Sequence, residues 1–85
     1  MFYVYYLKSQ SYPNKTYTGF THNFIQRFAE HNAGKSVYTK DFKPWIVVSV
    51  FIFDQEHKAL RFEQYLKSNA GRIFLKRYVA DDSSV

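Results

Sequence analysis

The sequence predicts an α+β fold, in which a three-stranded antiparallel sheet packs against flanking helices in the order β-β-α-α-β-α-α. Two aromatic segments separated by turn residues indicate a hairpin, a long apolar segment in mid-chain indicates a third strand, and amphipathic segments follow both. The chain has 85 residues, 46% hydrophobic and 21% aromatic, which is enough for one small core but not two. We therefore expect a single domain over residues 1–80 and a disordered acidic tail at 81–85.

The hairpin is predicted from residues 2–8 and 16–20. Aromatic and β-branched side chains, which favour strands, fill the first segment and recur in the second. Pro13-Asn14 lies between them and supplies the turn chemistry that a hairpin connection needs.

A helix is predicted over residues 24–32. Apolar side chains recur there at helical spacing, Thr21 or Asn23 can cap the first turn, and Gly34 ends the helix. Residues 35–43 are polar and short, which favours one or two further helical turns.

The third strand is predicted at residues 45–53. Every position in it except Ser49 is apolar, a pattern typical of a strand buried on both faces. We therefore expect this strand to be the central one.

Two helices are predicted after the third strand. The first begins at Asp54 or Gln55 and runs to about Ser68. The turn-forming residues 69–71 break it, and residues 72–78 resume as a short basic helix.

The charge of the chain indicates a polyanionic partner. Twelve Lys and Arg against seven Asp and Glu give +5; setting aside Asp81 and Asp82 of the tail leaves twelve against five, or +7. DNA or RNA suits this excess, because each neutralised phosphate releases counterions. The absence of Cys excludes a disulfide framework, and no apolar run is long enough to span a bilayer, so we expect a cytoplasmic protein without membrane contact.

Glu63 lies among the apolar residues of the last long helix, four positions after Ala59 and three before Leu66. A carboxylate that faces a core is costly unless it is paired or binds a metal. Two interpretations stay open: a functional carboxylate, or a helix-edge residue that points outward or pairs with Lys67.

Arg27 and His31 lie one helical turn apart and share a helix face with Phe24 and Phe28. Arginine makes two-pronged contacts with phosphate and histidine transfers protons near neutral pH, so the pair suits a phosphodiester substrate. The alternative is a solvated helix edge with Glu30 neutralising a neighbour.

Tyr5 and Tyr17 lie in the two strands of the predicted hairpin, and both hydroxyls can point from the same sheet face. Gly19 shares that face and would leave space for a substrate backbone to approach. Packing is the other role open to these tyrosines, because a tyrosine is a poor base at neutral pH unless a neighbour lowers its pKa.

A series of motifs in chain order resembles the GIY-YIG nuclease superfamily: Tyr3-Val4-Tyr5, Tyr17-Thr18-Gly19, Arg27-Phe28-Ala29-Glu30-His31, and then Glu63. The resemblance covers about residues 2–78. The short segments 17–21, 31–35 and 59–63 are similar in sequence to small, single-domain bacterial members related to the nuclease end of the excision-repair C subunit.

The resemblance implies an enzyme that hydrolyses DNA phosphodiester bonds with one divalent metal, Mg²⁺ or Mn²⁺. It implies Glu63 as the metal ligand, and Tyr5 and Tyr17 as the residues that position and activate the attacking water. It implies that His31 takes up the proton and that Arg27 stabilises charge on the phosphate.

Three positions depart from the family pattern. Tyr3 replaces the Gly of the first motif, Thr18 replaces the Ile of the second, and Phe20 stands where some relatives carry a lysine. The missing lysine shifts proton transfer onto His31. Some relatives also carry a functional Asn after the Glu, and Asn69 is the candidate for it here.

Basic residues outside the motifs would contact DNA phosphates: Lys35, Lys40, Lys43, Arg61, Lys67, Arg72, Lys76 and Arg77. We expect low intrinsic sequence specificity, since a chain this short has no room for a recognition domain. The cleavage site would then be selected by DNA shape, as in branched or damaged DNA during repair or recombination, or by a partner protein or homodimer. Two alternatives are a non-catalytic nucleic-acid-binding module with this fold and an interaction protein whose aromatic residues only pack.

Overall fold

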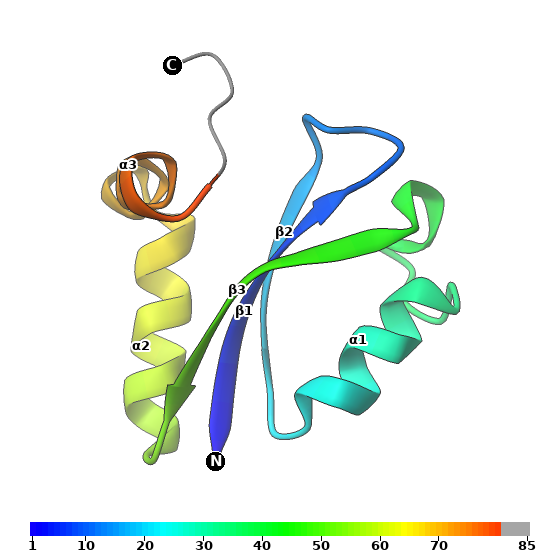
Figure 1. Ribbon diagram of the computed structural model, residues 1–85. Helices are drawn as coiled ribbons and strands as arrows, with labels where there is room; N and C mark the ends of the chain where they lie inside the picture. The colour runs from blue at the N-terminus through cyan, green and yellow to red at the C-terminus, as the bar shows by residue number, and fades with distance from the viewer. Residues whose placement is uncertain (81–85) are drawn as a thin grey trace.

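Three antiparallel strands form the sheet in a computed structural model of the chain (Figure 1). They are β1 (Phe2–Ser9), β2 (Thr16–Thr21) and β3 (Trp45–Phe53). β1 and β2 form the predicted hairpin, and β3 pairs with the other side of β1. The structure describes residues 1–80, so the tail predicted at 81–85 lies outside the described residues. The α+β class with a three-stranded antiparallel sheet is confirmed.

The central strand is β1 and not β3, so our prediction of a central third strand is wrong. Ile46 and Ile52 of β3 are 46% and 60% exposed, whereas Val4 and Tyr5 of β1 are covered on opposite faces of the sheet. A segment that is apolar at every position but Ser49 is thus compatible with an edge strand. The tyrosines of β1 explain why its central position was not predicted. Their polar hydroxyls are typical of a strand with one solvent-exposed face.

Helices cover both faces of the sheet (Figure 1). α1 (Phe24–Asn32) packs on one face, and α2 (Glu56–Lys67) and α3 (Asn69–Tyr78) pack on the other. A short 3-10 helix, η1 (Lys40–Phe42), lies in the connection from α1 to β3, where the sequence predicts one or two helical turns. Within residues 1–80, no helix combines the length and apolar character needed to cross a membrane.

α1 has the bounds that its cap and terminator residues predict. The Asn23 side chain accepts a hydrogen bond from the backbone N–H of Gln26 at 3.2 Å, which satisfies an otherwise unpaired donor of the first turn. Gly34 adopts a φ of 76° just after the helix, a conformation that glycine reaches without steric cost.

The junction between α2 and α3 falls at Ser68, so the predicted break at residues 69–71 is wrong. The Ser68 side chain accepts from the backbone N–H of Gly71 at 3.2 Å, which makes residues 69–71 the capped first turn of α3. A Cβ at Gly71 would collide with the Tyr65 carbonyl oxygen and lie 2.5 Å from the Leu66 Cα. This glycine therefore permits close packing at the corner rather than ending a helix.

The two faces of the sheet hold separate cores. Under α2 and α3 the buried residues are apolar: Val4, Ala59, Leu66 and Leu75. Under α1 the core consists of Tyr5, Leu7 and Trp45, with Tyr17, Phe24 and Phe28 around them. The residues of the nuclease-like motifs lie mainly in this second core.

Candidate active site

A buried hydrogen-bonded chain joins β1, α1 and the loop before η1. The Tyr5 hydroxyl lies 2.8 Å from His31 Nε2, and His31 Nδ1 lies 2.7 Å from the Thr39 hydroxyl. All three side chains are almost fully buried. Trp45 Nε1 donates to the Thr39 carbonyl at 2.9 Å, which ties the loop to β3. The His31 ring is therefore fixed in position through both nitrogens.

Burial controls the protonation of both ends of the Tyr5–His31 pair. Desolvation raises the pKa of Tyr5 to about 12; the neighbouring Tyr17 and Glu63 add to this rise, and Arg27 opposes it. Desolvation lowers the pKa of His31 to about 4, with the charge of Arg27 adding to the effect and Glu30 opposing it. At neutral pH Tyr5 keeps its proton and His31 is neutral, so the imidazole is free to accept one.

Gly19 makes room for the Tyr5 ring. The two residues are partners across the β1–β2 ladder, and a Cβ at Gly19 would collide with Tyr5 Cζ and Oη and lie 2.9 Å from Tyr17 Cε2. We expected this space to be open to a substrate backbone, but the tyrosine ring fills it. Gly19 thus sets the position of the Tyr5 hydroxyl.

Tyr17 lies on the same face as Tyr5 and packs over the buried pair. Its ring centroid is 6.1 Å from that of Tyr5 and 5.0 Å from that of His31. The Tyr17 side chain is half-buried, so it joins the buried network to the surface. Our prediction that both tyrosines share one face of the sheet is confirmed.

Arg27 lies one turn before His31 and is half-buried. Its Nη1 donates to Glu30 Oε1 at 3.0 Å, the pairing that we considered as the alternative role for this helix face. The guanidinium also acts on the protonation of Tyr5 and His31, so Arg27 lies at the same site as they do. Half-exposed ion pairs are weak, and Glu30 can release Arg27 to a phosphate at small cost.

Glu63 reaches the site from α2, on the opposite face of the sheet. Its side chain is only 14% exposed, which agrees with its place among apolar residues in the sequence. Its carboxylate pairs with Lys67 at 3.2 Å, the pairing that we weighed as its alternative role. The charge of Glu63 also adds to the rise in the pKa of Tyr5, as the smallest of its causes.

A metal ion at this site would have Glu63 as its protein ligand. Within residues 1–80, no group of three or more His, Asp or Glu side chains gathers to form an all-protein metal cage. A lone carboxylate fits Mg²⁺ or Mn²⁺, which keep most of their waters and complete their coordination with phosphate oxygens. The ion pair to Lys67 would have to open, and because the Lys67 side chain is 50% exposed, its ammonium group can return to solvent.

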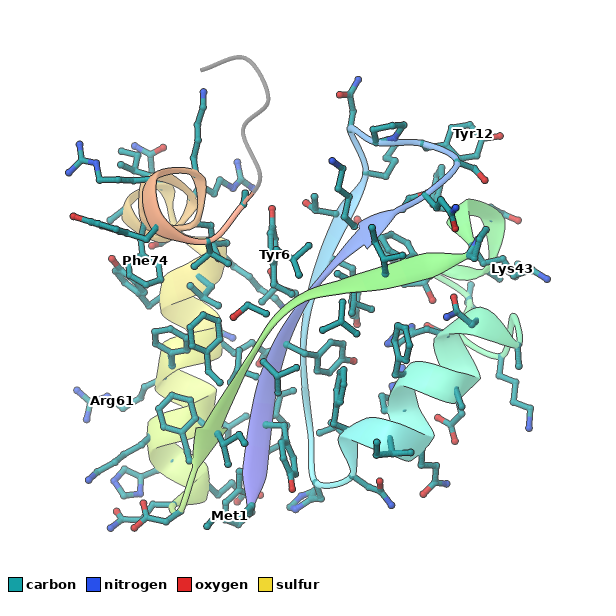
Figure 2. The ribbon with its side chains drawn as sticks, viewed as in Figure 1. Met1, Tyr6, Tyr12, Lys43, Arg61 and Phe74 are labelled. Atoms are coloured by element: carbon teal, nitrogen blue, oxygen red, sulfur yellow. The ribbon has the colours of Figure 1, made fainter. Side chains whose placement is uncertain are left out.

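The predicted phosphate contacts divide into three groups. Lys67, Arg72 and Lys76 line one groove beside Tyr17. Lys35, Lys40 and Lys43 are exposed in the connection between α1 and β3, and Figure 2 shows Lys43 at the far end of the sheet from α2. Arg61 points away from the sheet on the outer surface of α2 (Figure 2), and Arg77 lies against Tyr78 on α3. Asn69 is exposed at the first residue of α3.

Two residues of the site carry no signal that the sequence analysis used. Thr39 holds His31 in place, but it lies in a polar loop eight residues away. Tyr38 packs against Tyr17 with ring centroids 5.7 Å apart and belongs to the same loop. Tyr38 is exposed and Thr39 is buried. This difference could be predicted only from the path of the loop, which the sequence pattern does not give.

Comparisons with known proteins agree with this geometry. The family model for the GIY-YIG catalytic domain matches residues 1–78. The chain is 40% identical over 67 residues to a UPF0213 protein of Staphylococcus haemolyticus, covering 78% of this chain and 79% of the relative. It is 38% identical over 68 residues to a UPF0213 protein of Natronomonas pharaonis, covering 79% of each.

A solved structure supports the same relationship. The solution NMR structure of a UPF0213 protein from Bacillus halodurans superposes with a TM-score of 0.55 at 30% identity, covering 91% of this chain and 84% of that one. The series of motifs, the fold and the relatives lead to one conclusion: the chain belongs to the GIY-YIG family.

Proposed function

We propose that the protein is a metal-dependent endonuclease that hydrolyses phosphodiester bonds in DNA, including branched or damaged DNA, with low intrinsic sequence specificity. The observation that carries this proposal is the buried Tyr5–His31 pair, whose hydroxyl and Nε2 lie 2.8 Å apart. Arg27 of α1 and Glu63 of α2 both act on the pKa of Tyr5, although these residues come from three elements on both faces of the sheet. Membership of a family defined by a catalytic domain supports it.

The proton path runs through the buried pair. The attacking water gives its proton to the Tyr5 hydroxyl while Tyr5 passes its own proton to His31 Nε2, 2.8 Å away. The tautomer that permits this carries its proton on Nδ1 and donates it to Thr39. The low pKa of His31 opposes the transfer, and the negative charge of an incoming phosphate offsets that opposition.

The other residues act on the phosphate and the water. Arg27, released from Glu30, would stabilise the charge that develops on the phosphate oxygens. Tyr17, half-buried beside Tyr5, would orient the water. Glu63 would hold the divalent metal, which supplies Lewis-acid stabilisation of the phosphate when bound.

The test is a cleavage assay with labelled single-stranded, duplex, flap and four-way-junction DNAs in Mg²⁺, Mn²⁺ or EDTA. Glu63→Gln is compared with Glu56→Gln, an exposed glutamate of the same helix that pairs with His22 at 3.5 Å. We expect metal-dependent cleavage that Glu63→Gln abolishes and Glu56→Gln retains.

Two outcomes would contradict the proposal. Cleavage by Glu63→Gln at the wild-type rate would remove Glu63 from the chemistry. Salt-sensitive binding to these DNAs without cleavage of any of them would instead favour the non-catalytic nucleic-acid-binding module.

A further inference from the structure

A groove of about 820 Å³ begins at Tyr17 and continues between the β1–β2 hairpin and the corner of α2 and α3. Tyr6 of β1 lines it, and Figure 2 shows Tyr6 in the space between the sheet and α3. Because Tyr17 belongs to both, the groove is continuous with the candidate active site. A DNA strand held at the active site can therefore extend directly into it.

The charge of the groove suits a phosphate backbone. Lys67, Arg72 and Lys76 line it, and none of the lining residues found within residues 1–80 is acidic. Arg72 and Lys76 lie one helical turn apart on α3, so they present their charges on one side of that helix. Cations along one wall are what a nucleic-acid backbone requires.

The mouth of the groove carries an exposed aromatic face. Tyr38 is 72% exposed, and its ring centroid lies 5.7 Å from that of Tyr17 at an interplanar angle of 44°. An exposed aromatic ring beside a cationic wall is the combination that binds single strands, because an unpaired base stacks on the ring while its phosphate meets the cations. In a duplex the base faces are already covered by neighbouring bases.

We propose that this groove binds a single-stranded segment of DNA next to the cleaved bond, with a base stacked on Tyr38 and the phosphates along Arg72 and Lys76. This inference rests on the proposed function for the position of the cleaved bond, but it predicts binding that needs no catalysis. It makes unpaired DNA, such as a flap or a frayed end, the substrate class.

Binding is measured by fluorescence anisotropy in EDTA, with the full chain and a labelled thymidine oligonucleotide or a blunt duplex of the same length. Tyr38→Ala should weaken binding of the single strand about tenfold, the loss of one stacked base, and leave duplex binding unchanged. Tyr38→Phe should retain binding. The matched control is Tyr78→Ala, since Tyr78 is 70% exposed but does not line the groove, and it should behave as wild type.

The cationic wall is tested by the salt dependence of the same binding. Lys76→Gln should reduce the slope of log K against log salt by about 0.7, the contribution of one phosphate contact on a single strand. Lys58→Gln, an exposed lysine of α2 that does not line the groove, should leave the slope unchanged.

The inference is overturned if Tyr38→Ala matches Tyr78→Ala on the single strand, or if Lys76→Gln matches Lys58→Gln. Tighter binding of the duplex than of the single strand would also overturn it. The proposed function can fail separately: if no DNA is cleaved in any metal while these binding differences appear, the groove stands and the endonuclease does not. If DNA is cleaved but the variants bind it as their controls do, the endonuclease stands and the single-strand groove does not.

Discussion

The two faces of the sheet are built from different chemistry. Among residues 1–80, the face under α2 and α3 buries only apolar residues, and phenylalanine rings surround them: Phe2, Phe20, Phe51, Phe53, Phe62 and Phe74. The face under α1 contains buried polar side chains, those of Ser9, His31 and Thr39. Each of these polar atoms has a hydrogen-bond partner among the described residues. One face can thus supply stability while the other maintains groups that are costly to bury.

Glu63 connects the two faces. It belongs to α2, whose other inward residues are apolar, yet it acts on Tyr5 of the polar face. The candidate site therefore lies where the two regions meet rather than within either. Changes confined to one face should affect either chemistry or stability, and this separation can be tested.

The largest expected effect is on chemistry alone. Arg27→Gln should lower the cleavage rate about 10²- to 10³-fold, because it removes a fixed donor for charge on the phosphate. Since Arg27 is half-exposed and its ion pair is weak, the melting temperature should change little. Single-turnover cleavage and thermal unfolding measure the two quantities, and Arg27→Lys should restore only part of the rate. If the cleavage rate falls only in proportion to the fraction of folded protein, the separation of chemistry from stability is contradicted.

The next effect is on stability alone. Phe62 packs against Phe51 and Phe53 at centroid distances of 4.8 and 5.4 Å. Phe62→Ala should lower the free energy of unfolding by about 3 kcal/mol, through lost transfer energy and a residual cavity. Urea denaturation measures this change. The cleavage rate per folded molecule should remain that of wild type, and a fall of tenfold or more would show that the apolar face also shapes the site.

A comparable effect on stability should appear on the polar face as pH changes. The pKa of buried His31 is about 4 when folded against its ordinary 6.5, so the unfolded chain binds more protons between these values. Stability from this residue is fully present above about pH 6.5 and is lost as pH falls toward 4, by an amount on the order of 2–3 kcal/mol. Urea titrations at several pH values measure it. In His31→Gln this part of the pH dependence should vanish, and an unchanged profile would contradict the burial of a neutral imidazole.

The smallest effect concerns the ion pair that joins the site to the groove. Lys67→Gln should change the free energy of unfolding by less than about 1 kcal/mol, because the Lys67 side chain is 50% exposed. The same variant should lower the metal concentration needed for half-maximal cleavage, since Glu63 no longer has to leave an ammonium group. Metal titrations of the cleavage rate measure this. If the variant needs a higher metal concentration instead, Lys67 supports metal binding rather than competing with it.

Local signals predicted much of this fold. Asn23 and Gly34 give α1 its bounds because capping and left-handed geometry depend on single residues and their neighbours. Tyr5 and Tyr17 share a face because strand alternation is local. The inward position of Glu63 follows from helical spacing.

The errors concern contacts between distant segments. β3 is an edge strand because the hairpin leaves one side of β1 free, and no residue of β3 encodes that choice. Residues 69–71 were misread because a turn-forming sequence also suits a capped helix start packed tightly on its neighbour. Thr39 was missed because its partner His31 is defined only once the loop folds back.

The most direct test of the central claim is a titration of ¹⁵N-labelled protein with paramagnetic Mn²⁺, followed by NMR. A metal held by Glu63 should broaden the amide signals of its own helical turn and also those of Tyr17 and Arg27, on the opposite face of the sheet. Glu63→Gln should abolish both effects. Broadening centred on His22 and Glu56, or confined to α2, would contradict the account that the two faces meet at one metal-dependent site.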